Sequence, residues 1–134
     1  MSQQFSCHKI SEGCVEAEVL VSADAIMFYL FNPETGVMLE PGHALEGKCI
    51  SKKILIFPSG KGSSVVQADG LFQLMKHEHQ PVGMIVKYPE TVLVSSAILF
   101  EIPMVDKLDD EFYATVKDGD RIRLDADNGT VTIL

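Results

Sequence analysis

Residues 52–66 read "KKILIFPSGKGSSVV", an apolar run followed by a loop of glycines and serines. The run 52–57 predicts a buried strand that ends at Pro58, because proline cannot donate to a sheet ladder. Gly70, which costs about 1 kcal/mol inside a helix, lies within the segment that follows. Apolar residues nevertheless recur there at roughly helical spacing and predict a helix over 64–76: Val66, Leu71, Leu74 and Met75. The stretch therefore predicts a strand–loop–helix unit.

The remaining segments predict the fold class. Alternating or apolar runs predict strands over 14–22, 81–87 and 102–105, and 91–101 is either a helix or a strand followed by a helix. The turn Asp127-Asn128-Gly129 between two alternating runs predicts a terminal hairpin. Strands at both ends, with strands and helices alternating between them, predict one α+β domain over 1–134 with more than one sheet.

Composition and charge narrow the class of protein. The 134 residues are 46% hydrophobic and 22% charged, which is typical of a globular chain. No apolar run approaches the ~20 residues of a membrane span, and residues 1–10 lack the layout of a signal peptide. We therefore expect a soluble, cytoplasmic protein that does not associate with a membrane. The net charge of −8 argues against a nucleic-acid partner.

The three cysteines are Cys7, Cys14 and Cys49. Their odd number and the absence of a C-x-x-C pair argue against a disulfide framework. Cluster ligands are usually close in sequence, so these thiols are not expected to hold an iron–sulfur cluster. Cys14 begins a strand-like run, where a buried structural thiol is the expected role.

The loop has three interpretations. It is not a nucleotide P-loop, because Gly62 separates Lys61 from the serine that should follow directly. Glycine-rich backbone at a helix start can instead present N–H groups to an anion, with Lys61 adding positive charge. Ser63 or Ser64 is either a helix cap, which is the more common role, or a catalytic group whose alkoxide the local N–H groups stabilise.

The chain also resembles the small subunit of the aconitase X family along nearly its whole length. The segments that carry the resemblance are "VLVS" (19–22), "NPETG" (32–36), "HALEGKCI" (43–50), "ILIFPSGKGSS" (54–64), "IPMVD" (102–106) and "GDRIRLDADNGTV" (119–131). The resemblance implies a swivelling β/β/α domain, as in the swivel domain of aconitase.

The resemblance also implies roles for loop residues. Residues 60–64, "GKGSS", match the family's G-x-G-S-S loop, whose first serine is the catalytic base, so Ser63 takes that role. Residues 65–67, "VVQ", depart from the arginine, glutamate and histidine of aconitase, which argues against citrate-type substrates. Asn32 stands where family members often have aspartate. The substrate-binding set is assigned to Gly60, Lys61, Gly62, Ser64 and His43.

Other polar residues are weaker candidates. His43, Asp69 and Asp106 either line the same cleft or have ordinary surface or helix-start roles. His77 and His79 do not share a helix face, so we expect them to be exposed rather than to bind a metal. The apolar cluster Met27, Phe28, Tyr29 and Phe31 predicts core packing, with a subunit interface as the alternative.

The implied reaction is a dehydration, in which a base removes a proton from carbon and a Lewis acid withdraws the hydroxyl group. Family members dehydrate 5-phosphomevalonate or cis-3-hydroxyproline. Their iron–sulfur cluster lies in the large subunit, so we expect this chain to bind no cofactor, to act on a small molecule and to need that partner. The alternative is a non-catalytic swivel module that binds an anion or a partner.

Overall fold

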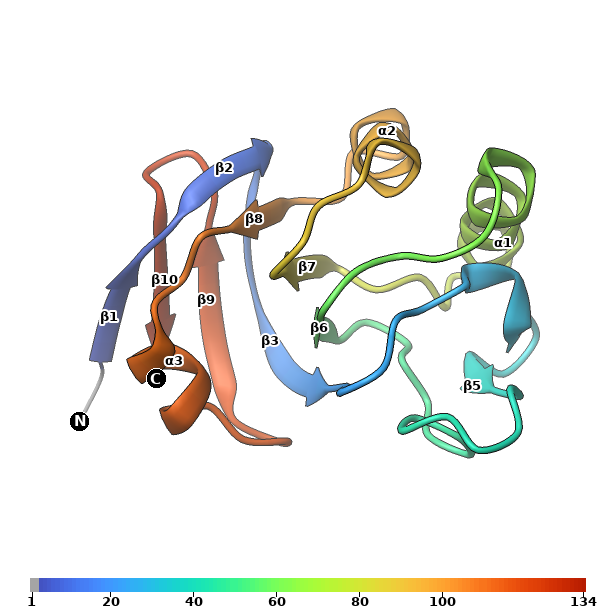
Figure 1. Ribbon diagram of the computed structural model, residues 1–134, viewed down its shortest axis with the longest axis horizontal. Helices are drawn as coiled ribbons and strands as arrows, with labels where there is room; N and C mark the ends of the chain where they lie inside the picture. Colours follow the sequence, from blue (N-terminus) through green and yellow to red (C-terminus); the bar gives the residue numbers. More distant parts are fainter. Residues whose placement is uncertain (1–2) are drawn as a thin grey trace.

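The computed structural model describes residues 3–134 and is shown in Figure 1. Its helices are η1 (Phe28–Leu30), α1 (Ser64–Lys76), α2 (Thr91–Leu99) and α3 (Asp110–Thr115). Its strands are β1 (Gln3–Ser6), β2 (His8–Ser11), β3 (Cys14–Val21), β4 (Phe31–Asn32), β5 (Val37–Met38), β6 (Ile54–Phe57), β7 (Gly83–Val86), β8 (Met104–Asp106), β9 (Arg121–Asp125) and β10 (Thr130–Ile133). Between residues 3 and 134, no helix is long and apolar enough to cross a membrane.

Eight strands form one sheet in the order β1-β10-β9-β3-β6-β7-β8-β2, and β4 and β5 form a separate pair. Strand β3 joins two halves of the large sheet, because it pairs antiparallel with β9 and parallel with β6. Strands β1 and β2 occupy the two ends of the order, yet only Cys7 separates them in the chain. The N-terminal segment therefore bends at Cys7 and joins both ends of the sheet, which gives it a barrel-like form.

The sheet separates two apolar cores. Along β6, Ile54 and Ile56 lie in the core between the two halves of the sheet, whereas Leu55 and Phe57 lie in the core beneath α1 and α2. This alternation is the period of two that a strand imposes, and all four side chains are buried because both faces are covered. Figure 1 shows α1 and α2 on one side of the molecule and β1, β9 and β10 on the other. The predicted α+β class and its β/β/α layering are confirmed.

Helix α1 packs closely against η1, and Gly70 allows this contact. A Cβ atom at Gly70 would lie 2.3 Å from the carbonyl carbon of Phe28 and 2.3 Å from the backbone nitrogen of Tyr29. The glycine that lowers the helix propensity of this segment is therefore required by the packing. Phe28 and Phe31 are buried in the core, as predicted, whereas Tyr29 is 56% exposed.

Several local predictions are confirmed. Helix α1 spans the predicted 64–76, and β9 and β10 form the predicted hairpin. The open choice over 91–101 resolves as helix α2, because both carboxylate oxygens of Glu90 cap its start by accepting from Val92 and Leu93. Strand β6 begins at Ile54, two residues later than expected, because Ser51 and Lys52 form a turn.

Candidate active site

The candidate site lies at one edge of the parallel strands. Strands β3, β6, β7 and β8 run parallel, so their carboxyl ends meet at the same edge. The loop 58–63 leaves β6 at that edge and leads into α1. In open α/β sheets this edge is where loops gather to bind ligands. The loop therefore stands where the topology favours a site.

The loop is held by a neighbouring segment. Ile26 donates its backbone N–H to Ser59 O at 3.0 Å, and Lys61 donates its N–H to Ile26 O at 3.1 Å. These bonds form a parallel bridge between Ile26 and Gly60. Ile26 is fully buried, so the bridge fixes the loop to the core. The loop is therefore fixed from Ser59 to Lys61, although it contains glycine.

Ser63 occupies the N-cap position of α1, with φ −79° and ψ 168°. Its side chain is exposed and makes no capping hydrogen bond to the helix. Helix geometry leaves the N–H groups of the first turn without intrahelical acceptors, and the first turn carries no acidic residue. The N-terminal end of the helix dipole therefore favours negative charge at the Ser63 oxygen. Ser64, the first helical residue, is also exposed.

Gly62 allows the loop to pass close to the first turn of α1. Its φ is +96°, a region that favours glycine, and a Cβ atom there would lie 2.7 Å from Val66 Cγ2. A side chain at this position would therefore require both a strained backbone and a shift of the first turn of α1. The glycine thereby determines where Ser63 begins the helix.

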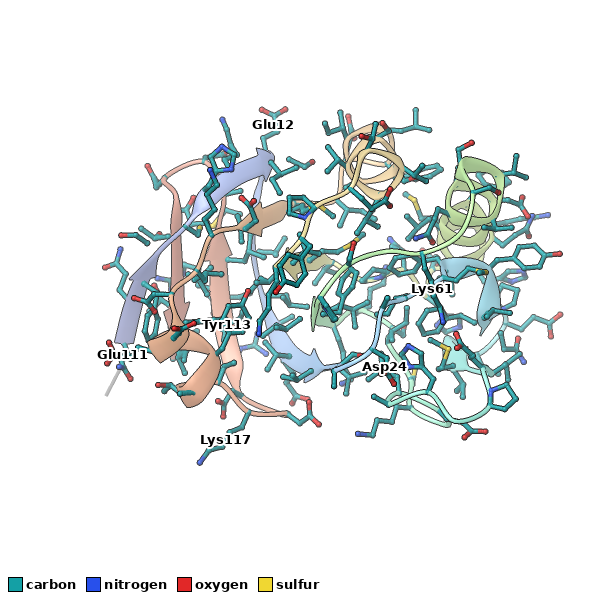
Figure 2. All side chains as sticks on the ribbon, in the orientation of Figure 1. Glu12, Asp24, Lys61, Glu111, Tyr113 and Lys117 are labelled. Carbon is teal, nitrogen blue, oxygen red and sulfur yellow. The ribbon has the colours of Figure 1, made fainter. Side chains whose placement is uncertain are left out.

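Lys61 is partly neutralised by an ion pair. Its Nζ donates to Glu40 Oε2 at 2.7 Å, and the two side chains are 39% and 22% exposed. Glu40 Oε1 is buried and has no hydrogen-bond partner among residues 3–134. The ammonium keeps two further N–H donors, but its charge is compensated. Figure 2 shows Lys61 on the side of the molecule where α1 lies.

His43 has a structural role in this geometry. It is 7% exposed, its Nε2 bonds to Ala25 O at 2.8 Å, and its Nδ1 accepts from Leu45 N at 3.0 Å. These partners require the tautomer that is protonated at Nε2. Both ring nitrogens are therefore used by the backbone, and His43 fixes the segment before β6 to the segment before η1.

The remaining candidates have contacts of their own outside the loop. Asp106 is buried and bonds to His8 Nδ1 at 2.7 Å. Asp69 lines a different hollow of about 420 Å³, together with Phe28, Tyr29 and Gln73. His77 is exposed as predicted, but the prediction for His79 was wrong: it is half-buried, and its Nδ1 bonds to Ser51 Oγ at 3.0 Å.

Sequence reasoning missed Gln67. This side chain is fully buried and contacts two backbone groups: Oε1 accepts from Phe28 N at 2.8 Å, and Nε2 donates to Ile26 O at 3.0 Å. Gln67 therefore fixes the start of α1 to the same segment that holds the loop. A sequence signal was present, because Gln67 lies at helical spacing from Leu71 and Leu74 on the apolar face.

The three cysteines are free thiols and do not form a common metal site within residues 3–134. Cys14 is exposed, so the expectation of a buried thiol was wrong; at the first position of β3 its side chain points away from the core. Cys49 is exposed as well, and Cys7 is half-buried. Within residues 3–134, no group of three or more His, Cys, Asp or Glu side chains is placed to hold a metal ion. The described side chains therefore offer no ligand set that fits an iron–sulfur cluster.

Comparisons with known proteins agree with this fold. The family model of the aconitase X swivel domain matches residues 4–133. A Methanococcoides burtonii protein named phosphomevalonate dehydratase small subunit is 41% identical over 132 residues, which cover 98% of this chain and 96% of that protein. An Archaeoglobus fulgidus protein of the same name is 36% identical and covers 98% of both chains.

A solved structure supports the same assignment. The crystal structure of Thermococcus kodakaraensis aconitase X in its holo-form superposes with a TM-score of 0.88 at 38% sequence identity, over 98% of both chains. The identity and the coverage are each high enough to show common descent as well as a common fold. The chain therefore belongs to the aconitase X swivel-domain family.

Proposed function

We propose that this chain is the small subunit of an aconitase-X-type hydro-lyase and that Ser63 is its catalytic base. The observation that carries the proposal is the state of the Ser63 hydroxyl. It is exposed at the start of a 13-residue helix and is not used as a cap. A serine whose only task was to cap the helix would direct its oxygen at the first-turn N–H groups.

In the proposed reaction, the deprotonated Ser63 oxygen takes a proton from a substrate carbon. The electron pair of that C–H bond forms a carbon–carbon double bond, and the neighbouring hydroxyl group leaves with the electrons of its C–O bond. The unpaired N–H groups of the first turn of α1 stabilise the charged oxygen before the proton arrives. Gly62 and the Ile26 bridge hold the oxygen in place, so little reorganisation is needed.

The Lewis acid belongs to a second polypeptide in this proposal. The side chains of residues 3–134 offer no ligand set for a metal cluster, and relatives are named small subunits. We assign the iron–sulfur cluster of the family to a large subunit, where it assists departure of the hydroxyl group. The exposed apolar residues Val65 and Phe72, seven apart on one face of α1, are 72% and 51% exposed and offer a contact surface beside Ser63.

The substrate is proposed to be 5-phosphomevalonate, with cis-3-hydroxyproline as the alternative. The names of the relatives support the first, since those proteins are called phosphomevalonate dehydratase small subunits. The ammonium of Lys87, which forms no ion pair among residues 3–134 and follows the strand next to β6, also supports it. Both compounds carry a hydroxyl group next to a carbon that can lose a proton.

The test is anaerobic reconstitution of the chain with its large subunit and an assay of both compounds. We expect Ser63→Ala to reduce kcat by about 10²- to 10⁴-fold, the contribution typical of a positioned base, with substrate binding largely kept. Ser95→Ala, which alters an exposed serine on α2, is the matched control and should keep wild-type turnover. The isolated chain should be folded and inactive.

Two results would contradict the proposal. Wild-type turnover by Ser63→Ala would show that Ser63 is not the catalytic base, and it would favour a non-catalytic binding module. Turnover by the chain without a large subunit would contradict the assignment of the Lewis acid to a second polypeptide. A kcat effect equal for Ser63→Ala and Ser95→Ala would indicate a general loss of helix structure.

A further inference from the structure

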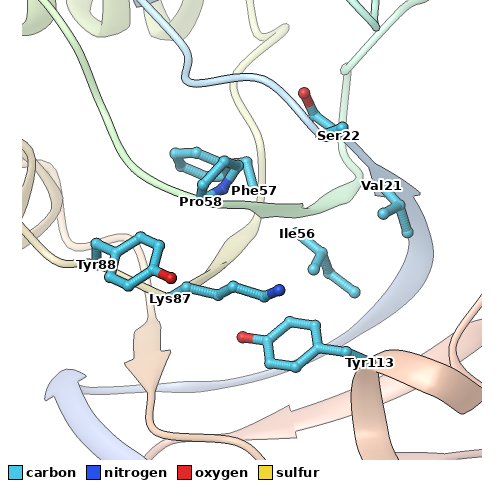
Figure 3. Close-up of a pocket in the computed structure, with 9 residues that line it drawn as sticks. Val21, Ser22, Ile56, Phe57, Pro58, Lys87, Tyr88 and Tyr113 are labelled. Atoms are coloured by element: carbon cyan, nitrogen blue, oxygen red, sulfur yellow. The ribbon is translucent and has the colours of Figure 1, made fainter. Parts of the chain in front are cut away.

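A second hollow lies at the same edge of the parallel strands. It has a volume of about 370 Å³, which is within the range of small-molecule sites. Its walls combine an apolar part, from Val21, Ile56, Phe57 and Pro58, with a polar part, from Ser22, Lys87, Tyr88 and Tyr113. Apolar walls with a few convergent polar groups are typical of ligand sites. Figure 3 shows the Lys87 side chain between Tyr88 and Tyr113, with its nitrogen over the Tyr113 ring and the Tyr113 hydroxyl directed toward the Tyr88 side.

Lys87 provides a cation without a carboxylate partner. Its ammonium lies 4.5 Å from the centre of the Tyr113 ring. No aspartate or glutamate among residues 3–134 forms an ion pair with it, in contrast to Lys61 and Glu40. Lys87 therefore brings to this hollow a positive charge that no carboxylate of the described residues pairs with.

Tyr113 provides a donor that lacks an acceptor. Its hydroxyl oxygen is buried and has no hydrogen-bond partner among residues 3–134, although buried hydroxyls are normally bonded. Burial, with smaller contributions from Asp106 and Tyr88, raises the pKa of Tyr113 to about 12. The hydroxyl therefore keeps its proton and can donate it. The nearby Asp106 carboxylate is bonded to His8 Nδ1 at 2.7 Å and not to Tyr113, which leaves the phenol proton available.

The backbone fixes this hollow to the loop of the proposed base. Lys87 and Tyr88 both donate their backbone N–H groups to Pro58 O, at 3.2 and 2.8 Å. Pro58 begins the loop that ends at Ser63. The cation and the proposed base thus belong to two adjacent connections at the same edge of the sheet.

We propose that this hollow binds the phosphate group of the substrate, with Lys87 and the Tyr113 hydroxyl as its ligands. The apolar wall formed by Ile56 and Phe57 contacts the carbon chain between the phosphate and the reacting centre. Lysine binds phosphate as a compact point charge, and a protonated phenol adds a hydrogen bond. This inference rests on the proposed function, because it places the phosphate of a substrate whose proton Ser63 removes.

The experiment measures binding without turnover. The two-subunit complex carrying Ser63→Ala is titrated calorimetrically with 5-phosphomevalonate and, separately, with mevalonate, which lacks the phosphate. Adding Lys87→Gln should raise the Kd for 5-phosphomevalonate about tenfold or more and leave the Kd for mevalonate unchanged. Tyr113→Phe, which removes only the hydroxyl, should raise the first Kd about three- to tenfold.

Lys117→Gln is the matched control, because Figure 2 shows Lys117 directed into solvent at the end of α3. It should leave both Kd values unchanged. The inference is overturned if Lys87→Gln binds 5-phosphomevalonate as tightly as the parent complex. It is also overturned if Lys87→Gln weakens the two ligands equally, which indicates a general structural effect.

Failure of the proposed function gives a different pattern. If Ser63→Ala turns over at the wild-type rate while the Lys87 effect persists, the base assignment fails and the phosphate site stands. If the complex does not bind 5-phosphomevalonate at all, inorganic phosphate is titrated into the full chain and the amide signals of Lys87 and Tyr88 are followed by NMR. Saturable shifts that Lys87→Gln abolishes support an anion site, and their absence overturns it.

Discussion

The side-chain oxygen of Gln67 accepts a hydrogen bond from the backbone N–H of Phe28 at 2.8 Å, in a fully buried contact between α1 and the segment before it. The nitrogen of the same amide donates to Ile26 O at 3.0 Å. Because Ile26 also bridges to Gly60, one side chain links the helix start, the loop and the preceding segment. The position of Ser63 therefore depends on a residue that is not itself exposed at the site.

Gln67→Leu should strongly destabilise the chain. It leaves the N–H of Phe28 buried without a partner, and such a group costs about 1–3 kcal/mol, while the carbonyl of Ile26 keeps only its hydrogen bond from Lys61 N–H. Chemical denaturation of the isolated chain measures the free energy of unfolding. The same substitution at Gln73, which is half-buried on the same helix, should cost less than about 1 kcal/mol. Equal effects at both positions would contradict a specific role for Gln67.

Ser63→Ala should change the free energy of unfolding by less than about 0.5 kcal/mol, because no capping bond is lost. Asp109→Ala is the informative comparison. Asp109 caps α3 by accepting from Phe112 N at 3.0 Å, and loss of such a cap costs about 1 kcal/mol. A loss at Ser63 as large as that at Asp109 would indicate that the serine caps α1 in solution.

Gly70→Ala should destabilise the chain by about 1–3 kcal/mol, although alanine is the better helix former by about 1 kcal/mol. The added methyl group would overlap the backbone of Phe28 and Tyr29, neither of which can rotate away. The reverse change on the same helix, Ala68→Gly, should cost about 1 kcal/mol through propensity alone. Thermal unfolding of both variants provides the measurement. Stabilisation by Gly70→Ala would show that α1 and η1 are less closely packed.

Phe72→Glu should weaken association with the large subunit and leave the fold unchanged, because Phe72 is 51% exposed. A buried charge without a partner at an interface typically costs several kcal/mol, so we expect at least a tenfold rise in the Kd between subunits. Analytical ultracentrifugation measures this Kd. Leu134→Glu, at a residue that is 45% exposed and outside α1, serves as the control. Assembly of Phe72→Glu at the wild-type Kd would place the interface elsewhere.

Alkaline pH should destabilise the fold through two groups. Burial raises the pKa of Tyr113 to about 12, and burial with smaller contributions from Asp106 and Asp125 raises the pKa of Cys7 to about 11. In the unfolded chain the thiol ionises near pH 9 and the phenol near pH 10. The unfolded state therefore loses protons first, so stability is fully present below pH 9 and falls as the pH rises to about 12.

Denaturant unfolding at intervals between pH 7 and 11.5 tests this expectation. Tyr113→Phe should flatten the decline above pH 10, and Cys7→Ala should flatten it between about pH 9 and 11. Tyr29→Phe, at a tyrosine that is 56% exposed, should leave the slope of the parent chain unchanged. A parent chain of constant stability from pH 8 to 11.5 would show that neither group is buried in solution.

The sequence predicts much of this fold because its local signals agree with one another. The apolar run of β6, the helical spacing after Ser63 and the turn Asp127-Asn128-Gly129 each specify their element without help from distant residues. Patterns of this kind are local, so they can be interpreted one segment at a time.

The parts that the sequence does not predict depend on tertiary contacts. The burial of His43, the ion pair of Lys61 with Glu40 and the hollow around Lys87 all join segments that are far apart in the chain. No local pattern marks such pairs. The role of Gly70 is similar, because its helix cost is visible in the sequence but the η1 backbone that requires it is not.

The bend at Cys7 places residues 3–6 beside β10 and residues 8–11 beside β8. One short segment thereby covers two strand edges at once. Removal of residues 3–11 would leave unpaired backbone donors and acceptors on both β8 and β10, and such rows recruit strands from other molecules. A shortened chain is therefore expected to self-associate in solution, which makes the intact N-terminal segment a requirement for any preparation in which assembly with a partner is to be measured.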